Sequence, residues 1–311
     1  MNPHMRPGVW GVLATPFAGS TLDVDDSGIA RLVEHADAAG VAGLTVLGVF
    51  GEAARLSWAE RRLVLETVLE TTDLPLVVGC TSLATAPVVD EARMAVELVG
   101  DRLAGVMVQA NSADPATLDA HLTAVHQASG ADVVVQDYPV VSGVHVSSAV
   151  LGDLVARSPH VTAVKAEAPP TPVAVAELTA RCDVPVFGGL GGINLLDELA
   201  CGAAGAMTGF SYPEGLVATV EAWDPAAPER SRAALLPYLP LITFEQQVGI
   251  ALAVRKECLR RRGLIAESGV RPPARVLPDS LRPLLAAHLD ATEAATGVPT
   301  RVPTGVTSGV A

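Results

Sequence analysis

Short apolar runs alternate with amphipathic segments along most of the chain. The runs are rich in Val and lack the polar alternation of a strand with one solvated face, which is typical of parallel strands buried on both faces. The intervening segments carry apolar residues at the three- and four-residue spacing of helices. The predicted strands are Val9–Phe17, Gly43–Gly48, Pro75–Cys80, Gly105–Gln109, Asp132–Asp137, Val161–Glu167, Pro185–Gly189 and Gly205–Phe210.

Start and stop signals support the helices between these strands. A side-chain oxygen just before a helix accepts a hydrogen bond from a free backbone N–H, and Gly is favoured just after a helix ends. We predict helices at Asp25–Gly40, Trp58–Thr72 and Ala84–Gly100, and a fourth that begins near Pro115. The start signals are Asp25, Ser57 and Asp114, and the stop signals are Gly40, Gly100 and Gly130.

Eight strand–helix units predict an α/β fold, the (β/α)8 or TIM barrel. A doubly wound sheet usually has fewer strands and a GxGxxG motif after the first one, whereas the first run here ends with Ala14-Thr15-Pro16-Phe17. We expect residues 1–224 to form the barrel, residues 225–296 a C-terminal helical extension, and residues 297–311 a disordered tail. The helices expected in the extension are Ala227–Gly263, interrupted at Pro237 and Pro240, and Ser280–Ala295.

Composition narrows the classes of function. The 311 residues include 34 acidic and 21 basic ones, a net charge of −13, so neither nucleic acid nor an anionic membrane is an expected partner. Aromatic residues make up only 4%, too few for a platform that stacks bases. The charge-free runs are too short to span a bilayer and the N-terminal segment lacks the apolar stretch of a signal peptide, so we expect a cytoplasmic protein. The four Cys and seven His show no metal-ligand spacing, and we expect neither a metal nor a cofactor.

One of the two lysines, Lys165, lies inside an apolar strand. In a TIM barrel the chemistry lies at the C-terminal ends of the strands, and the sixth run ends with Lys165-Ala166-Glu167. Burial lowers the pKa of an amine and leaves it nucleophilic. Strand side chains alternate, so Lys165 and Glu167 should both point into the barrel mouth. An imine-forming amine beside a carboxyl group suits proton abstraction next to an iminium carbon, whereas a plain ion pair is the structural alternative.

The second run ends with Gly48-Val49-Phe50-Gly51-Glu52. Its glycines let the backbone approach a ligand closely, and consecutive N–H groups can hold a substrate carboxylate; an ordinary loop is the alternative. The other lysine, Lys256, lies in a predicted helix between Arg255 and Glu257, where we expect a solvated surface charge.

Together these motifs resemble the family of dihydrodipicolinate synthase and N-acetylneuraminate lyase, which are class I aldolases and dehydratases on a TIM barrel. The resemblance runs from Gly8 to about Leu284 and rests also on Ala14–Phe17 and Gly205–Gly209. It implies a Schiff base between Lys165 and a small 2-oxo acid, and a homotetramer, with a homodimer as the alternative. The substrate-binding residues expected from it are Thr15, Gly48, Val49, Phe50, Gly51, Gln136, Tyr138, Gly189, Leu190 and Gly209.

The chain departs from the common family pattern at informative positions. Gln136 stands where most members have a tyrosine that relays protons, and an amide cannot relay a proton in that way. Val49-Phe50 replaces a Thr pair in the carboxylate loop, which leaves only the backbone donors of the loop. The arginine that binds a second carboxylate in dihydrodipicolinate synthase aligns with Val141, so lysine biosynthesis is not expected.

These departures resemble the branch of 2-keto-3-deoxy-L-arabonate dehydratase, which has Gln-Asp-Tyr-Pro on the fifth strand and Lys-x-Glu on the sixth. Leu190 departs even from this branch, where we expect an Asn. The resemblance implies that Lys165 attacks the C2 ketone of a 2-keto-3-deoxy sugar acid, that Glu167 removes a C3 proton, and that the C4 hydroxyl leaves. Two alternatives stay open. One is retro-aldol cleavage to pyruvate or the reverse condensation, and the other is a non-catalytic binding or regulatory protein on the same scaffold.

Overall fold

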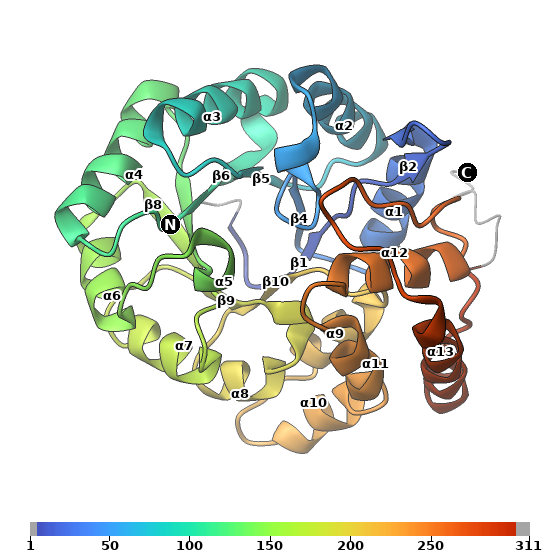
Figure 1. The fold of residues 1–311 in the computed structure, drawn as a ribbon. Helices are drawn as coiled ribbons and strands as arrows, with labels where there is room; N and C mark the ends of the chain where they lie inside the picture. Colours follow the sequence, from blue (N-terminus) through green and yellow to red (C-terminus); the bar gives the residue numbers. More distant parts are fainter. Residues whose placement is uncertain (1–4, 303–311) are drawn as a thin grey trace, which may run out of the picture.

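A computed structural model describes residues 5–302, and at their centre is a closed barrel of eight parallel strands (Figure 1). The strands follow the order β1-β10-β9-β8-β7-β6-β5-β4, and β4 closes on β1. They are β1 (Gly8–Val12), β4 (Gly43–Val46), β5 (Leu76–Cys80), β6 (Leu103–Gln109), β7 (Val133–Asp137), β8 (Val161–Ala166), β9 (Val186–Gly188) and β10 (Gly205–Thr208). The predicted (β/α)8 barrel is confirmed, and each predicted strand corresponds to one of these eight.

The first predicted strand is longer than the observed one. β1 ends at Val12, whereas the prediction extended it to Phe17. Phe17 instead begins β2 (Phe17–Ala18), which pairs antiparallel with β3 (Asp23–Val24) in a small separate sheet. Pro16 has no N–H with which to extend a strand ladder, and the buried Phe17 ring anchors the hairpin beneath Lys256 of the C-terminal extension. This hairpin was not predicted from the sequence.

Helices cover the outside of the barrel (Figure 1). They are α1 (Asp26–Ala38), α2 (Trp58–Thr71), α3 (Thr85–Val99), α4 (Pro115–Ser129), α6 (Ser148–Arg157), α7 (Thr171–Thr179), α8 (Leu195–Ala200) and α9 (Pro213–Glu221). Shorter turns are α5 (Pro139–Ser142), η1 (Ala53–Arg55), η2 (Gly100–Arg102) and η3 (Leu190–Gly192). The predicted caps are confirmed at Asp25, Ser57 and Asp114, each of which accepts a hydrogen bond from a backbone N–H in the first turn. Gly100 and Gly130 cap the ends of α3 and α4 with positive φ.

Inward-pointing apolar side chains fill the barrel below the C-terminal ends of its strands. Trp10 and Phe187 meet edge to face there, with ring centroids 6.4 Å apart. Gly43 leaves room for the indole ring, because a Cβ at this position would lie 2.4 Å from Trp10 Cζ3. The packed interior is made by Met5, Trp10, Val12, Val77, Ala104, Met107, Val134, Ala163, Phe187 and Met207. The barrel is therefore a filled core, and its inward-facing polar side chains lie above this layer at the C-terminal ends of the strands.

A helical extension follows α9 and packs beside α9 and α1 (Figure 1). Its helices are α10 (Pro228–Leu235), α11 (Leu239–Glu245), α12 (Ala251–Arg261) and α13 (Arg282–Thr296), with the turn η4 (Asp279–Leu281) before α13. Pro237 separates α10 from α11 as expected, but Pro240 lies in the first turn of α11, where its missing N–H needs no helical partner. A further break at residues 246–250, which was not predicted, separates α11 from α12.

The predicted C-terminal tail lies only partly within the described residues. Residues 297–302 follow the Gly297 cap of α13, and Val302 N–H donates to Arg262 O at 2.9 Å. Residues 303–311 lie outside the described residues, and the division of the chain at residues 224 and 296 stays a prediction. None of the helices between residues 5 and 302 has the length and hydrophobicity needed to cross a membrane.

Candidate active site

Lys165 and Glu167 meet at the C-terminal end of β8. Alternation along the strand puts them on the same face as Ala163, which belongs to the packed interior of the barrel. Lys165 Nζ lies 3.2 Å from Glu167 Oε2, and only 6% of Lys165 and 4% of Glu167 is exposed. A buried amine is thus held beside a buried carboxylate above the barrel core.

Three strand ends position the Glu167 carboxylate. Gln136 pairs in register with Lys165 across β7 and β8, and its Nε2 donates to Glu167 Oε2 at 2.6 Å. The Leu190 N–H donates to Glu167 Oε1 over a longer distance of 3.5 Å. Gly189 is required beneath this carboxylate, since a Cβ there would lie 2.4 Å from Glu167 Oε1. Lys165, Gln136 and Leu190 thus all place a donor on the Glu167 carboxylate, and Gly189 makes room for it.

Buried acidic groups around Glu167 have raised pKa values. Burial and the negative charge of Glu167 raise the pKa of Tyr138 to about 12, although the Arg255 charge opposes the shift. The same two causes raise the pKa of Asp137 to about 6, which the nearby His145 opposes. Burial raises the pKa of Glu198 to about 7, with a smaller contribution from Glu167. Tyr138 therefore keeps its proton at neutral pH and can donate a hydrogen bond from its hydroxyl.

The predicted carboxylate loop, residues 48–52, forms a tight turn above β4. Leu47 before the loop and Glu52 at its end both have positive φ, of 58° and 53°. Gly51 packs closely on the backbone of Gly48, because a Cβ on Gly51 would lie 3.2 Å from both the nitrogen and the oxygen of Gly48. The Thr15 hydroxyl donates to Gly51 O at 2.7 Å and fixes the loop to the chain that leaves β1. The predicted residues Thr15, Gly48 and Gly51 thus lie together at one side of the barrel mouth.

The expectation that Lys256 is a solvated surface charge is wrong. Lys256 is fully buried rather than solvated, and its Nζ lies 2.5 Å from Glu52 Oε1. Glu52 also accepts from Arg271 N–H at 3.0 Å and from Arg55 at 3.1 Å. Burial lowers the pKa of Lys256 to about 8, and the Glu52 charge opposes this shift. Sequence reasoning missed the pair because its two members are far apart in the chain and meet only when α12 packs on the loop.

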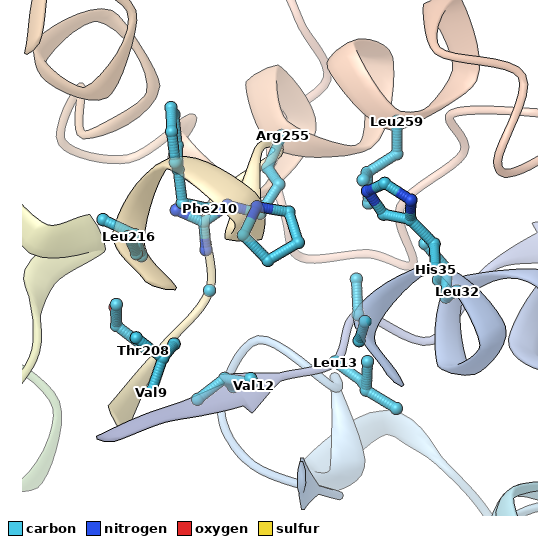
Figure 2. Close-up of a pocket in the computed structure, with 15 residues that line it drawn as sticks. Val9, Val12, Leu13, Leu32, His35, Thr208, Phe210, Leu216, Arg255 and Leu259 are labelled. Atoms are coloured by element: carbon cyan, nitrogen blue, oxygen red, sulfur yellow. The ribbon is translucent and has the colours of Figure 1, made fainter. Parts of the chain in front are cut away.

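Arg255, the neighbour of Lys256, was also missed. It is only 2% exposed, and its Nε lies 3.0 Å from Glu245 Oε2. Its Cζ stands 4.1 Å from the centre of the Phe50 ring, and Gly209 leaves it room because a Cβ there would lie 2.8 Å from Nη1. Figure 2 shows the Arg255 side chain reaching from α12 toward the end of β10. The available signal was the apolar sequence around it, Ala253-Val254 and Cys258-Leu259, which is typical of a buried helix.

Two cavities lie outside the Lys165–Glu167 pair. The first has a volume of about 40 Å³ and lies between β1, α1, the start of α9 and α12, with Arg255 and His35 on its wall (Figure 2). The second, of about 470 Å³, lies at the opposite end of the barrel, where residues 158–162 lead into β8 and residues 181–185 precede β9. Among residues 5–302 no group of three or more His, Cys, Asp or Glu is arranged to hold a metal ion.

The fold and the paired amine and carboxylate define a class, and comparison with known proteins gives the family. A TIM barrel with a buried Lys165–Glu167 pair at its C-terminal face has the architecture of a Schiff-base lyase. The model of the dihydrodipicolinate synthetase family matches residues 5–292, and the chain belongs to this family of Schiff-base lyases. The resemblance inferred from the motifs is confirmed.

Relatives within the family carry different activities. The chain is 30% identical over 296 residues to an L-2-keto-3-deoxyarabonate dehydratase of Azospirillum brasilense, covering 92% of this chain and 94% of the relative. It is also 30% identical over 275 residues to a 4-hydroxy-tetrahydrodipicolinate synthase of Kineococcus radiotolerans, covering 85% and 86% of the two chains. A crystal structure of dihydrodipicolinate synthase from Rhodopseudomonas palustris superimposes with a TM-score of 0.85 at 28% identity, over 93% of this chain and 98% of that one.

Proposed function

We propose that the protein dehydrates 2-keto-3-deoxy sugar acids through a Schiff base on Lys165. The observation that carries the proposal is the buried contact of 3.2 Å between Lys165 Nζ and Glu167 Oε2, with the Gln136 amide on the same carboxylate oxygen. The similarity to a dehydratase over 92% of the chain supports it.

The geometry supports a sequence of proton transfers through one carboxylate. The Lys165 amine attacks the C2 ketone, and loss of water gives an iminium that acidifies the C3 hydrogens. Glu167 accepts one of these protons and leaves an enamine. The enamine expels the C4 oxygen, which takes the proton back from Glu167 and departs as water. Hydrolysis of the imine restores Lys165 and releases an unsaturated 2-oxo acid, which for a five-carbon substrate tautomerises to 2,5-dioxopentanoate.

Gln136 favours loss of water over cleavage of a carbon–carbon bond. Retro-aldol cleavage needs a base that takes the proton from the C4 hydroxyl, whereas dehydration needs an acid that gives a proton to the same oxygen. The Gln136 amide can orient an oxygen by a hydrogen bond but cannot carry a proton away. Tyr138 cannot serve as that base near neutral pH, because its pKa is raised to about 12. Glu167, once protonated by C3, can serve as the acid.

Imine trapping and product analysis test the proposal together. Borohydride with pyruvate should add one adduct per chain, on the peptide that carries Lys165. Lys165→Ala should lose the adduct, and the matched control is Arg260→Met, a 42% exposed position on α12 that should trap as well as the parent. With 2-keto-3-deoxypentonates and hexonates, the expected product is a dehydrated 2-oxo acid. Pyruvate with a matching aldehyde would establish the aldolase alternative, and the absence of any adduct would favour the non-catalytic one.

The proposed oligomeric state and cellular location of the protein rest on the family resemblance and on the amino-acid composition. We infer a homotetramer or homodimer in the cytoplasm that acts on a small 2-oxo acid without a cofactor. Light scattering of the purified protein measures the oligomer directly.

A further inference from the structure

Gln109 ends β6 with a buried amide that points into the barrel mouth. Only 3% of the residue is exposed. Met107, two positions earlier, belongs to the packed interior of the barrel, so alternation along the strand directs Gln109 to the same side, one layer higher. Gln109 pairs in register with Gln136 of β7, and Gln136 pairs with Lys165 of β8. These three residues therefore form one row around the mouth, in strand steps of about 5 Å.

The amide of Gln109 is oriented by the loop that follows β5. Its Nε2 donates to Thr81 O over a distance of 3.4 Å. The Ser82 hydroxyl and N–H of that loop donate to Glu91 of α3 at 3.1 and 3.3 Å, which fixes the loop. Turning the amide over would bring its oxygen against Thr81 O, and two acceptors repel each other. Gln109 Oε1 is therefore held away from this loop.

Gln109 Oε1 is buried, and it has no hydrogen-bond partner among residues 5–302. Asn111 repeats the arrangement two residues later. Its Nδ2 donates to Leu83 O of the same loop at 2.9 Å, and its Oδ1 is buried without a partner in the described part of the chain. A buried acceptor that lacks a donor costs free energy, so such a group is typical of a position that meets a ligand. Both atoms are amide oxygens, which only accept hydrogen bonds, so the ligand group that fits them is a hydroxyl rather than an anion.

The order of the row indicates which hydroxyl this is. In the proposed function, on which this inference rests, C2 of the substrate is bonded to Lys165, and the C3 and C4 groups lie near Glu167 and Gln136. Gln109 is the next residue along the row. We propose that Gln109 Oε1 accepts a hydrogen bond from the C5 hydroxyl of the sugar acid, and that Asn111 Oδ1 accepts one from the C6 hydroxyl of a six-carbon substrate. Gln109 is in this role a specificity-determining residue, because it selects substrates that carry a hydroxyl beyond C4.

Two substrates that differ only at C5 test the inference. The acid 4,5-dihydroxy-2-oxopentanoate carries the C5 hydroxyl, whereas 4-hydroxy-2-oxopentanoate ends in a methyl group. Both are offered as each C4 epimer, and their consumption is measured as kcat/KM whatever product forms. The parent should prefer the dihydroxy acid by at least about tenfold, the effect of one lost hydrogen bond and a buried acceptor left unpaired. Equal kcat/KM values for the two acids in the parent would overturn the inference.

Gln109→Leu removes the acceptor and keeps a side chain of similar size. The preference for the dihydroxy acid should fall to about twofold or less, because only that acid loses a hydrogen bond. Pyruvate ends at C3, so borohydride trapping of pyruvate on Lys165 shows whether the variant keeps its reactive amine. Gln109→Met, whose unbranched side chain follows the shape of Gln, is the second variant. Gln127→Leu is the matched control, since Gln127 is an exposed amide on α4, and it should keep the preference of the parent.

Two results with the Gln109 variants would overturn the assignment. One is an unchanged preference in a variant that still traps pyruvate, and the other is an equal loss of kcat/KM with both acids, which would mean that Gln109 only shapes the mouth. Asn111→Leu tests the outer acceptor. It should lower kcat/KM by about tenfold for 2-keto-3-deoxyhexonates and by less for the five-carbon acid, and equal losses would overturn the role of Asn111.

Product analysis separates this inference from the proposed function. If the preference depends on Gln109 but the products are pyruvate and glycolaldehyde, the inference holds and the dehydratase proposal fails. If the product is a dehydrated 2-oxo acid but the preference does not depend on Gln109, the dehydratase proposal stands and the inference fails. A parent that forms no adduct with pyruvate and consumes neither acid would overturn both.

Discussion

The buried ion pair between Lys256 and Glu52 gives the sharpest test of how the carboxylate loop is held. Both side chains are fully buried, and Lys256 Nζ lies 2.5 Å from Glu52 Oε1. Replacing Lys256 by Met keeps most of the apolar stem but leaves the Glu52 charge buried. Removing one partner of such a pair costs about 3–5 kcal/mol. We expect a value near the lower end, about 3 kcal/mol, because Arg55 and the Arg271 N–H still donate to Glu52.

Urea unfolding followed by circular dichroism measures this loss. The double variant Lys256→Met with Glu52→Gln should recover much of the stability, because it removes the uncompensated charge. Arg260→Met is the control, and it should change stability by less than about 1 kcal/mol, because Arg260 is 42% exposed and Glu257 keeps Arg261 and Arg282. If Lys256→Met lowered stability by no more than this control, Lys256 would not hold the loop, and the reasoning from burial would be wrong.

The remaining predictions concern two buried carboxyl groups, Glu167 in the candidate site and Asp137 near it. Glu167→Gln should still form the imine on Lys165, but turnover should fall by about 10²- to 10⁴-fold in a product assay, and a loss of only a few fold would place the base elsewhere. Asp137 has a pKa raised from its ordinary value of 3.8 to about 6, so the folded protein holds this proton more tightly than the unfolded chain. The extra free energy of unfolding that this proton gives is therefore fully present below pH 3.8. It falls by about 2–3 kcal/mol as the pH rises through about 6. Asp137→Asn should make the decline in urea unfolding between pH 4 and pH 7 smaller by this amount, while Glu198, whose pKa is raised to about 7, keeps its own share, and an unchanged decline would show that Asp137 does not contribute.

The strands and helix caps could be predicted because their signals are local. A run such as Val161–Ala166 is apolar whatever lies around it, and Ser57 caps α2 through an N–H in the first turn. Lys165 could be singled out for the same reason, since a charge inside an apolar strand is visible in the sequence. The β2–β3 hairpin could not be predicted, because its strands are two residues long and are fixed by what covers Phe17.

The burial of Arg255 and Lys256 depends on partners remote in sequence. Glu52 and Phe50 lie roughly two hundred positions before α12, and no pattern within the helix reports that they will meet it. The dipeptide Arg255-Lys256 looks like an ordinary solvated pair of charges until the extension packs on the barrel. The apolar residues that flank it indicate a buried helix, but they do not say what its charges face.

α12 makes the helical extension part of the candidate site. Neighbouring side chains on a helix point in different directions, and here the two cations reach the same loop at different points. Lys256 pairs with Glu52 at the end of the loop, while Arg255 stacks on Phe50 in its middle. Glu245 of α11 in turn holds Arg255 through Nε. A shift of α12 would therefore move both contacts together, so the loop can keep its position above the barrel only while the extension stays docked.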